Sequence, residues 1–188
     1  MFKNLIKEDI KLKKKLVKFE SKILKIIEIL STKFLEKKRV FICGNGGSAA
    51  DAQHLSAEFL VRLRPNINRK PYPLITLMQD SSTFSACSND YSFEQIFKRN
   101  LQALGNSGDV LICLTTSGNS KNILNVIKFA KKNDILVISL LGKDGGNCKS
   151  LSDIEIIIPS NKTAKIQECH MMLGHHILEK VEDRLIDV

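Results

Sequence analysis

From residue 40 onward, short apolar runs alternate with segments of helical periodicity. The apolar runs are Arg39–Cys43, Leu74–Leu77, Asp109–Leu114, Leu136–Leu140 and Ile154–Ile158, and the helical segments are Ser48–Leu63, Phe93–Leu104, Asn122–Asn133 and Thr163–Ile186. Parallel strands are joined by crossover connections, usually helices, and strands covered on both faces are almost continuously apolar. The pattern therefore predicts an α/β fold, in which a five-stranded parallel sheet lies between two layers of helices.

The N-terminal part of the chain is helical in pattern but carries no strand. Residues 1–39 contain neither glycine nor proline, and apolar residues recur at steps of three and four. This spacing predicts an amphipathic helical stretch with a break near Ser31, which packs on the sheet or on a partner subunit. Because no repeat or linker interrupts the sequence, we expect residues 1–188 to form one domain with this stretch as its extension.

The charge and the cysteines of the chain indicate where the protein is located in the cell and which classes of partner it binds. The formal net charge is +9, but the lysines are spread along helix-like segments and only 6% of residues are aromatic. Solvated helix faces explain this better than a nucleic-acid surface, and a positive field also suits an anionic substrate. The chain has no long apolar run and no secretory signal, and its five cysteines are scattered. We expect a cytoplasmic protein with reduced thiols and no membrane or nucleic-acid partner.

Loops rich in glycine and hydroxyl groups follow two of the predicted strands. GNGGS (44–48) follows the first strand, and TTSGNS (115–120) follows the third. Ligands of open parallel sheets bind beyond the carboxyl ends of the strands, where backbone N–H groups at helix N-termini hold anions. Neither loop has the lysine of a P-loop or the G-x-G-x-x-G of a dinucleotide site. The loops therefore favour a small phosphomonoester, although N-caps and tight turns use the same residues.

The helical segment after the first loop carries two groups suited to acid–base chemistry. With Ser48 as the N-cap, His54 and Glu58 lie at i and i+4 on one face of the helix. This spacing suits two metal ligands, or a base with a neighbour that tunes it. A surface ion pair is the commoner use of such a pair, so the spacing leaves both interpretations open.

The last helical segment holds three of the four histidines. Gln167 and His175 are eight residues apart, about two turns, and therefore share a face. Met171 and neighbouring apolar residues indicate that much of this helix is buried. We expect His170 and His176 to be core residues with satisfied hydrogen bonds.

Several separated motifs occur in a characteristic order. They are CGNGGS followed by D-A-x-H-x-x-x-E, the loop SNDYSF, then TSGNS, LLGKDGG and I-Q-E-x-H. Together they resemble the sedoheptulose 7-phosphate isomerases, or phosphoheptose isomerases, of the sugar-isomerase (SIS) superfamily, and the resemblance runs nearly end to end. It implies a flavodoxin-like SIS fold and conversion of sedoheptulose 7-phosphate to D-glycero-D-manno-heptose 7-phosphate, the first step toward surface heptoses of lipopolysaccharide or capsule. It also implies a cytoplasmic homotetramer with active sites between subunits and one zinc ion per subunit.

The resemblance assigns roles to individual residues. Glu58 and His175 would transfer the protons, Glu58 between C1 and C2 through an enediol and His175 between the two oxygens. The metal ligands would be His54, Glu58, Gln167 and His175. The residues expected to bind the substrate are Asn45, Gly46, Gly47, Ser48, Glu58, Arg62, Asn89, Asp90, Thr115, Thr116, Ser117, Ser120 and Gln167.

Two other functions stay open for a chain of this fold. The related replication-initiator-associating proteins bind a DNA-replication initiator and have no known isomerase role. At the positions of Glu58 and His175 they have residues that cannot carry protons, whereas both groups are present here. The third possibility is another aldose–ketose isomerase, or a sugar-phosphate sensor.

Overall fold

The protein, described by a computed structural model over residues 2–78 and 80–186, is built on a five-stranded sheet of order β2-β1-β3-β4-β5. Every neighbouring pair of strands is parallel, so the predicted α/β class and strand number are confirmed. The strands are β1 (Val40–Gly44), β2 (Leu74–Thr76), β3 (Val110–Thr115), β4 (Leu136–Gly142) and β5 (Ile154–Ile158).

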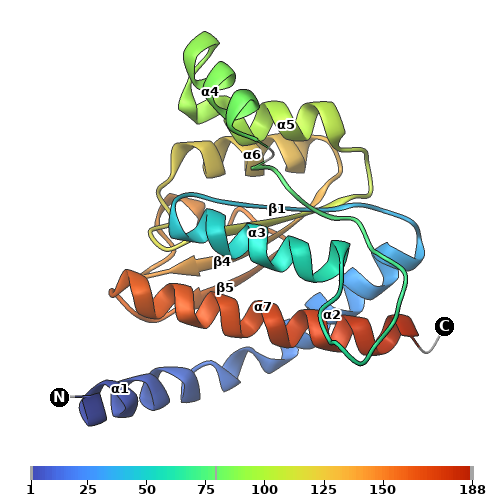
Figure 1. The fold of residues 1–188 in the computed structure, drawn as a ribbon. Coiled ribbons are helices and arrows are strands. Elements are labelled where there is room, and N and C mark those ends of the chain that lie inside the picture. Colours follow the sequence, from blue (N-terminus) through green and yellow to red (C-terminus); the bar gives the residue numbers. More distant parts are fainter. Residues whose placement is uncertain (1, 79, 187–188) are drawn as a thin grey trace.

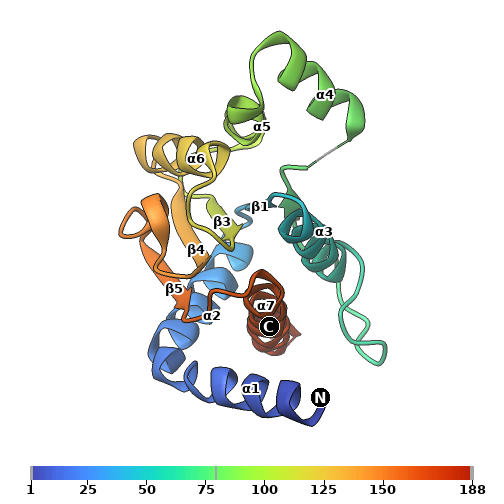
Figure 2. The ribbon, with the colours of Figure 1, turned by 90° about the vertical axis from the view of Figure 1, so that its left-hand side faces the viewer.

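Helices cover both faces of the sheet, as predicted. Figures 1 and 2 show α2, α3 and α7 on one face and α5 and α6 on the other. Successive strand side chains point to opposite faces, so Ile42 and Ile112 pack in the first layer while Phe41 and Leu111 pack in the second. The helices are α1 (Phe2–Lys14), α2 (Glu20–Leu35), α3 (Gly47–Leu60), α4 (Ser81–Asp90), α5 (Ile96–Leu104), α6 (Lys121–Lys132) and α7 (Thr163–Ile186), with 3₁₀ turns at Val17–Phe19, Phe93–Gln95 and Gly146–Cys148.

The N-terminal helical stretch is present, but its break lies elsewhere than predicted. The chain turns at Val17–Phe19, and α2 continues through Ser31. The buried hydroxyl of Ser31 donates to the carbonyl of Ile27, 2.8 Å away. A serine that bonds back to the preceding turn is compatible with a helix interior, so the prediction of a break near Ser31 was wrong.

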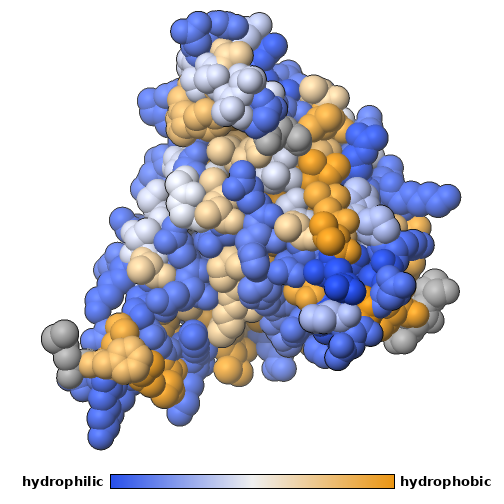
Figure 3. Space-filling model, viewed as in Figure 1, coloured by the Kyte–Doolittle hydropathy of each residue, from blue (hydrophilic) through white to orange (hydrophobic). Residues whose placement is uncertain are grey.

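Helix α1 extends away from the rest of the chain. It has no buried residue, and Figure 3 shows apolar atoms gathered at its free end. Phe2, Ile6 and Ile10 are exposed, while Glu8 and Asp9 pair with lysines that flank and begin α7, at 2.8 Å each. The polar side of α1 is therefore tied to its own chain, and an apolar side is left uncovered.

Helix α4 was not predicted, because the sequence analysis expected a loop at SNDYSF. Its ten residues are mostly small and polar, so no apolar period reveals it. Its start is nevertheless encoded, since the Asp80 carboxylate accepts a hydrogen bond from the Thr83 N–H at 2.8 Å, an N-cap. Of all the helices that the described residues form, none is both long and apolar enough to cross a membrane.

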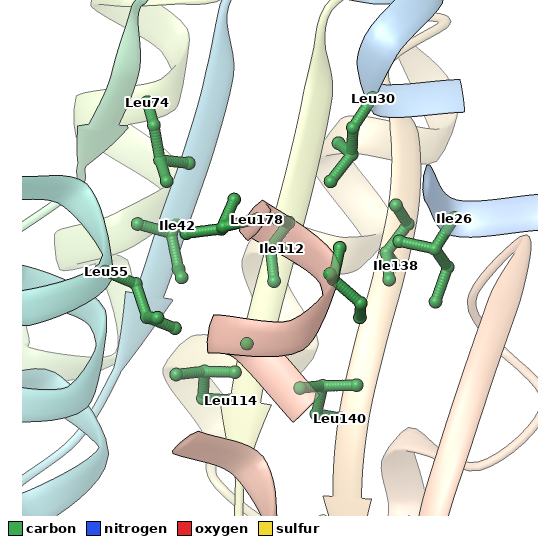
Figure 4. Close-up of a pocket in the computed structure, with 12 residues that line it drawn as sticks. Ile26, Leu30, Ile42, Leu55, Leu74, Ile112, Leu114, Ile138, Leu140 and Leu178 are labelled. Atoms are coloured by element: carbon green, nitrogen blue, oxygen red, sulfur yellow. The ribbon is translucent and has the colours of Figure 1, made fainter. Parts of the chain in front are cut away.

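A small apolar cavity lies between the sheet and the layer of α2, α3 and α7 (Figure 4). Its volume is about 30 Å³, and side chains such as Ile112, Leu140 and Leu178 line it. A space of about one water molecule without polar partners stays dry. The cavity is therefore a packing gap in the core, and the candidate site must be sought elsewhere.

Candidate active site

The two glycine-rich loops meet where the sheet reverses its winding. β1 and β3 are neighbours, and the chain leaves them for helices on opposite faces, α3 and α6. Such a switch point is where open α/β sheets bind ligands. The side-chain amides of Asn45 and Asn122 exchange two hydrogen bonds, of 2.9 and 2.8 Å, between the loops. Asn122 thus helps to hold the site, although the sequence analysis did not identify it.

The first loop ends in a tight entry to α3. Gly46 is the N-cap residue, with φ of +56°, a region that favours glycine. Ser48 lies within the first turn and is buried, so its expected role as the N-cap was wrong. Gly47 packs directly against the side chain of Gln167 on α7, and a Cβ atom there would require the Gln167 amide to move. Glycine therefore sets the turn at Gly46 and leaves space for Gln167 beside Gly47.

The second loop is shaped by its own hydroxyl groups. Thr115 and Ser117 accept hydrogen bonds from the N–H groups of Gly118 and Asn119, at 3.2 and 3.1 Å. Ser120 is the N-cap residue of α6, but its hydroxyl makes no capping bond. A hydroxyl and helix N–H groups left without helix partners, next to a glycine turn, can bind a phosphate.

A second group of residues meets between α3 and α7, which lie side by side (Figures 1 and 2). The His54 Nε2 atom lies 3.1 Å from a carboxylate oxygen of Glu58 and 2.9 Å from the Nε2 atom of His175. The Glu58 side chain is 18% exposed and that of His54 is 50% exposed. Gly174 allows the close approach of the two helices, because a Cβ there would lie 2.6 Å from Leu55.

The cluster of His54, Glu58 and His175 fits a metal ion. One nitrogen or oxygen atom from each residue lies within 4.8 Å of the others. Ligands of a tetrahedral zinc ion, at about 2.0–2.1 Å from the metal, lie roughly 3.3 Å apart, and imidazole and carboxylate are common donors. The observed 2.9 and 3.1 Å separations are close to that value. The donor set and its spacing therefore suit a zinc-like cation.

Other residues expected at the site lie apart from this cluster. Gln167, the fourth expected ligand, contacts Gly47 at the start of α3. Arg62 is exposed beyond the end of α3, and Asn89 and Asp90 are exposed at the end of α4. Within one chain, the expected residues other than Arg62 thus form three groups: the two loops, the α3–α7 cluster and the end of α4.

Asp51, which the sequence analysis did not assign to the site, stands in the D-A-x-H motif one turn before His54. Its Oδ2 atom is buried without a hydrogen-bond partner. Burial raises the pKa of this carboxyl, and the charge of His54 opposes the rise. A carboxyl group whose pKa is raised by burial, next to a cluster of histidines, is typical of functional sites.

The two remaining histidines of α7 differ from each other. His170 is fully buried and donates from Nε2 to the carbonyl of Leu141 at 3.2 Å, as expected of a core residue. Its Nδ1 atom has no partner, so its hydrogen bonds are only half satisfied. His176 is exposed, and its assignment to the core was wrong because it lies on the side of α7 that faces away from the sheet.

Comparison with known proteins identifies the family. The SIS domain family matches residues 8–142. The phosphoheptose isomerase of Clostridium acetobutylicum is 44% identical over 183 residues, covering 96% of this chain and 92% of that protein. That of Leptospira biflexa is 49% identical over 146 residues, covering 78% of this chain and 75% of that protein.

Solved structures agree with the sequence comparison. A phosphoheptose isomerase from Francisella tularensis superposes with a TM-score of 0.91 at 32% identity, covering 97% of this chain and 96% of that one. The phosphoheptose isomerase from Neisseria gonorrhoeae gives 0.87 at 33% identity, covering 97% of each chain. The chain therefore belongs to the phosphoheptose isomerases, a family of SIS-domain enzymes that interconvert aldoses and ketoses.

Proposed function

We propose that the protein converts sedoheptulose 7-phosphate to D-glycero-D-manno-heptose 7-phosphate in the cytoplasm, as the first step toward surface heptoses. The observation that carries the proposal is the convergence of Glu58, His54 and His175 from two helices. The names of the relatives support the substrate class. The free state of all five cysteines is consistent with a reducing compartment.

The phosphate end of the substrate is assigned to the two loops. The N–H groups at the starts of α3 and α6 carry the positive ends of the helix dipoles. The hydroxyls of Thr116, Ser117 and Ser120 lie on the loop between β3 and α6, and Ser48 lies in the first turn of α3, directly after the other loop. This composition supports binding of a compact dianion without a metal or a P-loop lysine.

The carbonyl end of the substrate is assigned to the α3–α7 cluster. Isomerisation removes a proton from C1 and delivers one to C2, and a single carboxylate on one side of the sugar can perform both transfers through a cis-enediol. Glu58 is that carboxylate, and its partial burial keeps it from bulk water. His175 moves a proton between O1 and O2. Each such group typically contributes about 10²–10⁴ in rate.

We assign one zinc ion per subunit to His54, Glu58 and His175. A bound zinc ion would polarise the sugar carbonyl and stabilise negative charge on its oxygen. Gln167 stays a proposed fourth ligand on the family resemblance alone, since it contacts Gly47 in this chain.

The arrangement of the three residue groups favours active sites between subunits of a homotetramer. His54 follows Gly47 by seven residues, so it lies about 10 Å along the axis of α3 from the loop, and Glu58 lies farther still. Loops from a neighbouring subunit can bring a phosphate nearer to the cluster. The uncovered apolar side of α1 offers a surface for such assembly.

The test is isomerisation in deuterium oxide followed by NMR. Purified protein with zinc should convert sedoheptulose 7-phosphate to an aldose 7-phosphate that carries solvent deuterium at C2. The variant Glu58→Gln, which keeps the size of the side chain, should retain the fold and form no product. Wild-type protein that forms no product would refute the proposal and favour a binding role of the replication-initiator-associating kind. A fully active Glu58→Gln would remove Glu58 from the mechanism.

A further inference from the structure

Arg69 stands in the surface loop between α3 and β2, yet its side chain is 3% exposed. Its Nε atom donates to a carboxylate oxygen of Glu182 at 2.6 Å. Its two terminal nitrogens donate to the carbonyls of Glu58 and Phe59, at 2.8 and 3.1 Å. One planar guanidinium thus connects α7 to the backbone of the residue assigned to proton transfer.

The contact lies at the last turn of α3, where carbonyl groups lack partners inside the helix. The last four carbonyl groups of a helix have no partner inside the helix, and α3 ends at Leu60. Arg69 occupies the carbonyls of Glu58 and Phe59 and places its positive charge at the negative end of the helix dipole. It therefore ties down the final turn, which carries the Glu58 side chain.

Aromatic rings fix the guanidinium in place. Its central carbon lies 4.8 Å from the ring centroid of Phe59 and 5.6 Å from that of Tyr72. These rings pack on Phe34, with centroids 5.3 and 5.4 Å away. A cation packed against two rings and hydrogen-bonded to several partners is restricted in conformation, so the contact can transmit position.

We propose that Arg69 is a positioning residue that sets Glu58 and His54 relative to His175, an inference that rests on the proposed function of that cluster. α3 and α7 contact each other at Gly47–Gln167 and Leu55–Gly174, both on the N-terminal side of Glu58. The Arg69–Glu182 pair ties the end of α3 to α7 beyond it, since Glu182 follows His175 by seven residues, about two turns. Arg64 also reaches Glu182, but of the two arginines only Arg69 bonds to the carbonyls of Glu58 and Phe59.

The chain offers a matched pair of variants. Arg69→Lys keeps a positive charge near Glu182 but cannot donate to Glu182 and both carbonyls at once, because an ammonium lacks the planar fork. Arg64→Lys is the control, since Arg64 also pairs with Glu182, at 2.6 Å, and with Asp183, at 2.6 Å. Both changes weaken an ion pair with the same buried carboxylate, that of Glu182. Only Arg69, however, also bonds to the backbone of α3.

The readouts are kcat, KM and titration with Co²⁺, whose visible absorption reports tetrahedral ligands. Arg69→Lys should weaken Co²⁺ binding about 10–100-fold, the usual effect of losing a group that orients metal ligands, and lower kcat with little change in KM. Arg64→Lys should keep the Co²⁺ affinity and kcat of the wild type. A folded Arg69→Lys with wild-type kcat and Co²⁺ affinity would overturn the positioning role.

A second variant keeps the proposal testable if Arg69→Lys does not fold. Arg69→Met with Glu182→Met removes both charges, so no unpaired ion is left buried between them. This double variant should fold and still show weak Co²⁺ binding and low kcat, and wild-type values in it would refute the positioning role. Wild-type protein that neither binds Co²⁺ nor isomerises the sugar would instead refute the proposed function.

Discussion

Folding stability should depend on pH through one buried histidine. His170 is fully buried on α7, and burial lowers its pKa from 6.5 to about 4, against the opposing hydrogen bond to Leu141. In the folded protein the ring is therefore neutral at pH 5, whereas in the unfolded chain it is protonated below about pH 6.5.

The size of the effect follows from this difference. Between about pH 6.5 and pH 4 the unfolded chain binds a proton that the folded chain does not, so stability falls as the pH falls. Above pH 6.5 the ring is neutral in both states, and the protein has its full stability with respect to His170. At pH 5 the loss is about 2 kcal/mol, and below pH 4 it approaches about 3 kcal/mol, since each pKa unit corresponds to about 1.4 kcal/mol.

The assay is guanidinium unfolding at pH 8, 6 and 5, at one protein concentration because association shifts apparent stability. The variant His170→Gln keeps a donor of similar reach for the carbonyl of Leu141 but does not titrate. The wild type should lose about 2 kcal/mol more than the variant between pH 8 and pH 5. Equal losses in the two proteins would show that His170 is not the group responsible.

Two further changes test the site itself. His54→Ala should lower the zinc-to-protein ratio measured by elemental analysis, while His176→Ala, an exposed change outside the cluster, should leave it at the wild-type value; an unaltered ratio in His54→Ala would exclude it as a ligand. Ser117→Ala together with Ser120→Ala should raise KM by roughly tenfold or more, since a hydrogen bond to a charged group contributes about 1.5–3 kcal/mol. An unchanged KM in steady-state assays would argue against phosphate binding by this loop.

Much of the fold could be predicted because burial leaves a regular trace in the sequence. The strands are largely apolar, with Glu155 of β5 an exception, and α7 spans Thr163–Ile186, as predicted. Neither α4 nor the turn at Val17–Phe19 is marked by a regular apolar pattern in the sequence. The first is polar with no buried residue, and the second lies in a lysine-rich segment whose apolar positions continue across it. For α4, the Asp80 N-cap rather than any apolar period marks the start of the helix.

The site was predictable only in part. Motif spacing together with the family resemblance predicted His54, Glu58 and His175 as site residues, but the register of α3 against α7 depends on tertiary contacts that no spacing encodes. Those contacts are the packing of Gln167 on Gly47 and the burial of Glu182 between two arginines. The segment RPNINRKPYP is polar and contains three prolines, a composition typical of a surface loop, yet the side chain of Arg69 within it is buried. A charged residue in a polar segment gives no sign of such a role.

The structure also weighs against the plainest interpretation of the His54–Glu58 pair, a surface ion pair on one helix. Such a pair needs only its two members and tolerates full exposure. Here His175 of a different helix brings a second imidazole nitrogen to 2.9 Å, Glu58 is mostly buried, and Asp51 leaves a buried oxygen without a partner. The Asp51 oxygen costs stability, because a buried polar atom has lost water without a new partner. An unfavourable choice next to two histidines and a carboxylate from two helices is expected where function, rather than stability, determined the residues.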